Sequence, residues 1–121
     1  MSRVEALNKV LHNLQTGSPD VEASALISED GLMIASSLPQ GMEEARVGAM
    51  SATLLSLGTR ASSELQRGGL REVLIRGEEG YACMLDAGSG TLLLAVTTAQ
   101  AKLGLLFLDM RRAVDEIRRV L

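Results

Sequence analysis

The chain has 121 residues, a formal net charge of -3 and no shift in composition along its length, which fits a single domain over residues 1–121. Hydrophobic residues make up 46% of the chain and aromatic residues only 2%, so aliphatic side chains must fill the core. Proteins that bind nucleic acid neutralise phosphates and often stack bases on exposed rings. A negative chain with Tyr81 and Phe107 as its only rings is poorly suited to either task, and nucleic acid is excluded as an expected partner.

The beginning of the chain and its single cysteine predict a cytoplasmic protein. Arg3, Glu5 and Lys9 interrupt the stretch where a secretory signal would be apolar, and no run of about 18 apolar residues occurs anywhere. Membrane insertion is therefore not expected. Cys83 has no partner for an internal disulfide and lies in the apolar run 81–85, which favours a buried thiol over a reactive one.

The first elements in chain order are a helix and a hairpin. Ser2 and Glu5 form a capping-box pattern ahead of apolar residues at helical spacing. Residues 21–28 and 32–37 are short apolar-rich runs separated by an Asp-Gly dipeptide at 30–31, which readily supplies the positive φ angles of a tight turn. The sequence predicts an amphipathic helix followed by two antiparallel strands.

A long helix is predicted between the turn at residues 38–41 and the glycine pair at 68–69. Its centre, residues 47–59, carries no charge, and at about 100° per residue its uncharged side chains fall into two stripes. We call the first the large-residue stripe and expect it to pack on the chain's own sheet; it comprises Val47, Met50, Leu54, Leu57, Gly58, Ala61 and Leu65. The second is the small-residue stripe, made of Gly48, Ser51, Ala52, Leu55, Thr59 and Ser62.

The small-residue stripe is predicted to contact the same helix of a second copy, because small side chains let two helix backbones approach closely. The alternative is that these residues merely tolerate exposure to water. Arg46 and Arg60 lie in the remaining, charged sector of the helix. They are candidates for binding a partner, and the alternative is that they only keep the surface soluble.

Three strands and a helix complete the chain, at residues 70–76, 81–86, 91–98 and 102–121. The strand at 91–98 is apolar at consecutive positions, which indicates that both of its faces are covered and that it lies in the middle of the sheet. The strand at 70–76 mixes charged and apolar residues, as edge strands do, and its edge is predicted to pair with a second copy at Arg71, Val73 and Ile75. The element order predicts an α/β (α+β) fold, a five-stranded antiparallel sheet with helices on both faces.

No catalytic group, cofactor site or metal site is predicted. His12 is the only histidine, so a Ser-His-acid triad has no other possible base, and one His with one Cys gives no metal-ligand spacing. The glycine-rich segment at 88–91 lacks the lysine of a phosphate-binding loop and precedes a strand, so a hairpin turn explains it better. The chain is expected to be a binding module and not an enzyme.

Three segments in this order, DGLMIASS, AMSATLLSLGTRASSEL and KLGLLFLDMRRAVDEI, resemble the bacterial branch of the roadblock/dynein light chain family. The resemblance implies a profilin-like fold with the central helix on one face of the sheet and the terminal helices on the other. It also implies a homodimer built from the central helices and the edge strand at 70–76. Bacterial members are associated with Ras-like small GTPases, which implies a homodimeric regulator of such a GTPase, either activating or effector-like. The alternative is a purely structural dimeric adaptor with no effect on nucleotide turnover.

Overall fold

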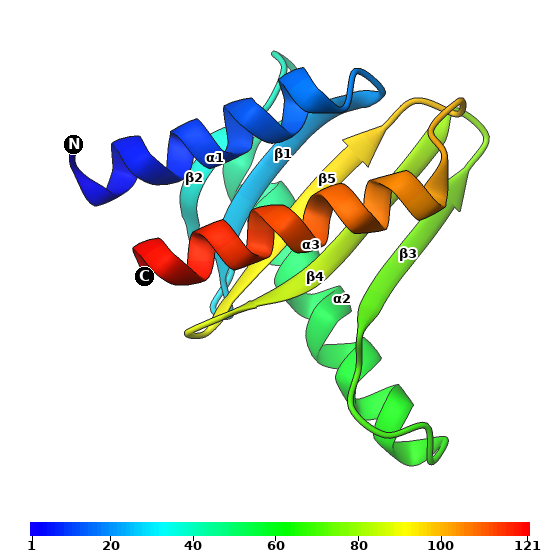
Figure 1. Ribbon diagram of the computed structural model, residues 1–121. Coiled ribbons are helices and arrows are strands. Elements are labelled where there is room, and N and C mark those ends of the chain that lie inside the picture. Colours follow the sequence, from blue (N-terminus) through cyan, green and yellow to red (C-terminus); the bar gives the residue numbers. More distant parts are fainter.

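The computed structural model describes residues 1–121 as one antiparallel sheet between two layers of helices (Figure 1). Helices α1 and α3 lie side by side on one face of the sheet, and α2 crosses the opposite face. The predicted order of elements is confirmed. The elements are α1 (Arg3–Gly17), β1 (Val21–Ser28), β2 (Met33–Ser37), α2 (Glu44–Glu64), β3 (Glu72–Gly77), β4 (Gly80–Gly88), β5 (Thr91–Thr97) and α3 (Leu103–Val120).

The strand order in the sheet is β2-β1-β5-β4-β3, with every neighbouring pair antiparallel. Strand β5 is therefore central, as its uninterrupted apolar sequence predicts. Its side chains alternate between two cores, because Leu93 packs under α1 and α3 while Leu92 and Leu94 pack under α2. Strand β3 lies at one edge of the sheet, as its charged residues predict.

The two faces of the sheet are covered unequally. The core beneath α1 and α3 contains 17 buried residues, among them Leu7, Leu11, Met110 and Ile117. The core beneath α2 contains only 5, and its helix contributes half-buried side chains around them. The α1 and α3 side therefore holds most of the apolar burial that stabilises the fold.

The ends of the helices follow from local hydrogen bonding. The Ser2 side chain accepts a hydrogen bond from the Glu5 amide at 3.1 Å, which satisfies one free N–H at the start of α1. Helix α2 ends a few residues before the glycine pair, because Gln66 adopts φ 57° and turns the chain there. The Arg67 amide then donates to the Ser62 carbonyl at 2.8 Å and the Gln66 amide to the Ser63 carbonyl at 3.0 Å, a Schellman arrangement formed without glycine. None of the helices combines the length and the apolar character needed to span a bilayer.

Candidate interaction surface

Helix α2 packs on the sheet through its small-residue stripe together with Val47, Leu54 and Gly58 of the large-residue stripe, so the sequence prediction holds only in part. Gly48 and Ser51 are the buried residues of α2, and Ser51 is only 2% exposed. Ala52 and Leu55 are half-buried against the core under α2. Gly48 and Ser51 therefore have little surface left for the predicted contact with a second helix, and Ala52 and Leu55 also pack on the chain's own sheet. At the far end of the stripe, Thr59 is exposed.

The reason is a close approach between α2 and the β1–β2 turn. A Cβ atom added to Gly48 would overlap the carbonyl oxygen of Gly31 and lie 3.2 Å from its carbonyl carbon. Gly31 itself has φ +87°, which the turn requires and which side chains rarely adopt. Farther along, a Cβ on Gly58 would lie 3.0 Å from Val73 and 3.3 Å from Leu70. Small residues are needed at these two positions of α2 because the backbone of the β1–β2 turn and the side chains of Val73 and Leu70 lie directly against them.

The rotation of α2 leaves much of the large-residue stripe in solvent. Met50 is 54% exposed, Leu57 58% and Leu65 68%; we call these three residues the α2 flank. The C-terminal part of α2 also extends past β3 and beyond the sheet (Figure 1). Large apolar side chains gathered on one side of a helix, with nothing of their own chain covering them, mark an interaction surface.

A shallow hollow of about 580 Å³ lies at the end of the sheet where β3 ends and β4 begins. Its apolar lining comes from Met42, Ile75, Tyr81, Ala82 and Val96, and three carboxylates, Glu22, Glu78 and Glu79, also line it. No residue of α2 lines this hollow. Part of the sheet face that α2 crosses is thus open, apolar and bordered by negative charge.

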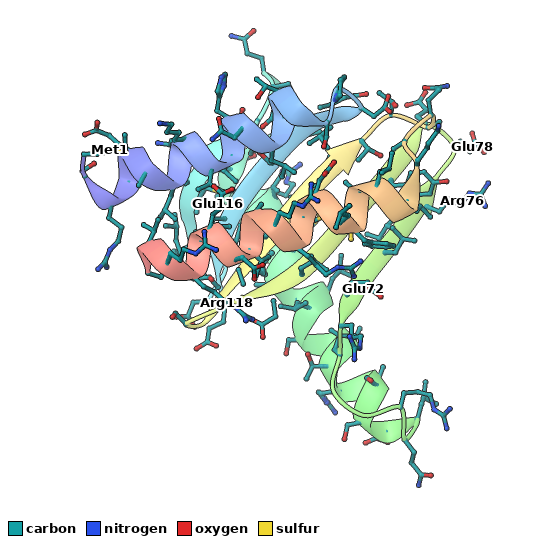
Figure 2. The ribbon with its side chains drawn as sticks, in the orientation of Figure 1. Met1, Glu72, Arg76, Glu78, Glu116 and Arg118 are labelled. Atoms are coloured by element: carbon teal, nitrogen blue, oxygen red, sulfur yellow. The ribbon has the colours of Figure 1, made fainter.

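The edge strand β3 presents its outer backbone without a partner strand. Of the three edge residues predicted, Arg71 precedes the strand, Val73 packs against the core under α2, and Ile75 is 42% exposed. Figure 2 shows Arg76 and Glu78 at the outer margin of the molecule, at the end of β3. The edge is available for pairing mainly through its backbone and Ile75.

The two arginine candidates lie far apart and do not form one site. Arg46, in the first turn of α2, makes an exposed ion pair with Glu43 at 3.8 Å, a geometry that contributes little stability. Arg60 is exposed 14 positions later, about 21 Å along the helix axis. It lines a hollow of about 410 Å³ whose other charged residues are Glu29 and Asp30 of the β1–β2 turn.

Cys83 is fully buried, which confirms the prediction of a buried thiol. Burial raises the pKa of this thiol from 9.0 to about 12, and the nearby Glu72 carboxylate adds to the rise. His12 is exposed on the outer face of α1. No three His, Cys, Asp or Glu side chains are grouped so that they could hold a metal ion.

The profile of the Roadblock/LC7 domain family matches residues 7–98, well over half of the sequence. The chain belongs to the Roadblock/LC7 domain family. It is 41% identical over 98 residues to an uncharacterized protein of Methanocaldococcus jannaschii, an alignment that covers 81% of this chain and 82% of the relative. A second uncharacterized protein of that organism is 38% identical over 98 residues, an alignment that covers 81% of this chain and 85% of the relative. Family membership is thus established at the level of sequence.

Solved structures share the fold. Myxococcus xanthus MglB superposes with a TM-score of 0.89 at 17% identity, covering 99% of this chain and 90% of MglB. The Roadblock/LC7 domain from Streptomyces avermitilis superposes with a TM-score of 0.86 at 24% identity, covering 93% of this chain and 94% of that domain. Profilin IB of Acanthamoeba castellanii superposes with a TM-score of 0.68 at 15% identity, covering 95% of this chain and 99% of the profilin. The predicted profilin-like roadblock fold is therefore confirmed.

The sequence prediction missed the orientation of α2, and one signal could have given it. Gly48 and Gly58 both lie inside the helix, where glycine costs about 1 kcal/mol relative to alanine. Such a cost is usually offset by a close approach of backbone or side chains. Two interior glycines therefore indicate the side of the helix that meets its own sheet.

Proposed function

We propose that the protein is a homodimeric regulator of a prokaryotic Ras-like small GTPase, acting in the cytoplasm by binding and without catalysis of its own. Residues 1–121 would act as a single roadblock-type domain. Membership of the Roadblock/LC7 family supports the proposal. The observation that carries it is the α2 flank, because Met50, Leu57 and Leu65 are exposed on a helix that extends past the sheet edge.

The dimer would form by antiparallel pairing of β3 with β3 of a second copy about a two-fold axis. This pairing would put the start of the partner's β3 beside the end of this one. The projecting C-terminal part of the partner's α2 would then lie over the hollow floored by Ile75, Ala82 and Val96. Each α2 flank would become buried against the other helix and the open sheet, which the hydrophobic effect favours.

Charge supports the same arrangement. The projecting end of α2 and the turn after it carry Arg60, Glu64 and Arg67, a net positive charge, whereas the hollow is lined by Glu22, Glu78 and Glu79. Opposite charges on the two facing surfaces would steer association and fix its register more than they would add affinity. The dimer contact is therefore assigned to the α2 flank, while the sheet-facing side chains of α2 hold the helix on its own sheet.

The paired α2 helices would form the surface that meets the GTPase. Regulation requires that this surface bind one nucleotide state of the GTPase more tightly than the other, since only differential affinity shifts an equilibrium. Exposed Arg46 and Arg60 are the groups available to meet charge developing on the transferred phosphoryl group. Alternatively, the dimer would order the catalytic residues of the GTPase itself.

The dimer contact is tested with Leu57→Glu and the neighbouring Ser56→Glu. The carboxylate at position 57 would be buried without a cation in the dimer, at a cost of several kcal/mol, whereas the exposed Ser56 lies about 100° around the helix, outside the α2 flank. Light scattering should give twice 12.8 kDa for the wild type and Ser56→Glu, and 12.8 kDa for Leu57→Glu. A wild-type monomer, or a dimeric Leu57→Glu protein, would refute this interface.

The regulatory role is tested with purified Ras-like GTPases of the same organism, by measuring phosphate release and binding to the GDP-bound and GTP-bound forms. Acceleration of hydrolysis, or at least about tenfold tighter binding to one form, supports a regulator. Binding to both forms equally, with unchanged turnover, would instead support the structural adaptor. Arg60→Ala separates contact from activation, because loss of turnover with retained binding would identify a direct role for that arginine.

A further inference from the structure

A separate pocket of about 240 Å³ lies on the α1 and α3 side of the molecule, away from α2. It opens where the α1–β1 loop, the β5–α3 loop and the first turns of α3 come together. Its apolar lining includes Pro19, Val21, Leu105 and Leu106, and its charged lining is Asp20, Lys102 and Asp109. The pocket thus combines apolar walls with two carboxylates and one ammonium group.

Hydrogen bonds fix the rim of this pocket. The Thr98 amide donates to the Asp20 carbonyl at 2.9 Å, and the Thr98 hydroxyl donates to the Asp20 carboxylate at 3.0 Å. On the other side, the Ser18 hydroxyl donates to the Asp109 carboxylate. The Val21 amide closes the loop by donating to the Ser18 carbonyl at 2.8 Å. A pocket tied in this way is largely preformed, which lowers the entropic cost of binding.

The two carboxylates are partly withdrawn from water and lack a cation. Asp20 and Asp109 are both half-buried, and one oxygen of each accepts the hydroxyl hydrogen bond just described. The second oxygen of each has no hydrogen-bond donor within the protein, and the one ion pair of the chain lies elsewhere, on α2. Lys102 is exposed and leaves the lining with a net charge of about -1 at neutral pH.

An exposed apolar surface continues from the pocket along α3. Leu105 is 57% exposed and Leu108 40%, one turn apart on the outer side of the helix. Farther along the same side, the exposed residues are charged: Arg112, Asp115 and Arg119. The apolar character is confined to the turns that border the pocket.

We propose that this pocket binds an arginine side chain of a partner protein. The methylene stem lies along Leu105 and Leu106, and the guanidinium donates to the free oxygens of Asp20 and Asp109. Arginine fits better than lysine, because its planar fork of five donors can serve two carboxylates at once and is less strongly hydrated. Flanking apolar residues of the partner contact Leu108. A dimer formed through α2 carries two such pockets on its opposite face, so the inference concerns a second partner and does not depend on the GTPase.

The test uses Nα-acetyl-arginine methylamide as the probe and the citrulline analogue as its neutral control of equal shape. The methyl signals of Val21, Leu105 and Leu106 are followed by NMR during titration of the full chain. Saturable shifts confined to these residues are expected with arginine, and binding should be at least about tenfold weaker with citrulline, since charge-assisted hydrogen bonds are lost.

Asp109→Asn and Asp115→Asn provide the matched pair of variants. Asparagine at position 109 can still accept the hydrogen bond from the Ser18 hydroxyl but carries no charge, so the affinity for arginine should fall about tenfold. Asp115 is exposed, and Asp115→Asn should leave the affinity unchanged. If Asp109→Asn unfolds, the same titration is made with Asp20→Asn, which should also weaken the binding of arginine. Equal binding of arginine and citrulline, shifts spread over other charged surfaces, or no saturable shift would overturn the proposal. The Leu57→Glu protein should bind the probe as the wild type does, which keeps this result separate from the proposed dimer.

Discussion

Replacement of Gly48 by alanine tests the close packing of α2 on the β1–β2 turn. The new Cβ atom would overlap the Gly31 carbonyl oxygen, and both groups belong to backbone, so neither can rotate away. Separating them requires α2 and the hairpin to move apart, and overpacking of this kind costs about 1–3 kcal/mol. Alanine also gains about 1 kcal/mol of helix propensity over glycine. Because the overlap is between backbone groups, the overpacking cost should lie near the upper end of that range, and we expect a net loss of about 2 kcal/mol in the free energy of unfolding.

The matched control is Gly104→Ala, because a Cβ on Gly104 meets nothing within 4 Å. Gly104 lies in the first turn of α3, where alanine should be neutral or stabilising by up to about 1 kcal/mol. Urea unfolding followed by circular dichroism measures both variants at one protein concentration, since dimerisation would add to apparent stability. Making both changes in the Leu57→Glu background separates packing within the chain from contact between chains. A Gly48→Ala protein as stable as the wild type in that background would refute the packing of α2 described above.

Three further predictions concern the core, the thiol and a helix end. Ser24→Ala should lower the free energy of unfolding in urea by about 1 kcal/mol, because the fully buried Ser24 hydroxyl donates to the Gln15 side-chain oxygen at 2.6 Å and links β1 to α1. An unchanged urea midpoint would contradict this. Cys83 should not react with a thiol reagent at pH 8 unless the protein unfolds, because its pKa is raised to about 12. The thiol of the unfolded chain ionises from about pH 9, while the folded protein keeps the Cys83 proton. The contribution of this group to the free energy of unfolding should therefore fall between pH 9 and 12. The Cys83→Ala protein should lack this part of the pH dependence. Ser2→Ala should cost about 1 kcal/mol by removing the cap on α1, and Glu5 amide exchange should become faster.

Much of the fold could be predicted because local chemistry and global packing agree. The Asp-Gly turn at 30–31, the Ser2 cap and the apolar run of β5 each have one favoured structural solution, and the structure adopts it. The end of α2 was less predictable, since Gln66 adopts the left-handed conformation that glycine usually provides. Contacts between distant segments were the least predictable, because the packing of Gly48 on Gly31 depends on the tertiary structure.

The orientation of α2 explains why the sequence prediction and the structure differ over which side chains of the helix meet the sheet. Periodicity shows that a helix has two uncharged sides, but it does not show which side meets the sheet. Side-chain size suggested that all the large residues were core, yet the hairpin turn at Gly31 comes so close to Gly48 that only glycine fits there, while Val47 and Leu54 still pack on the core under α2. Leu57 and Leu65 are consequently held in solvent by the same contact that fixes the helix. Because the contact with Gly31 turns Met50, Leu57 and Leu65 away from the sheet, these large side chains are left to be buried by another protein, which is why the α2 flank is the surface we assign to the second copy.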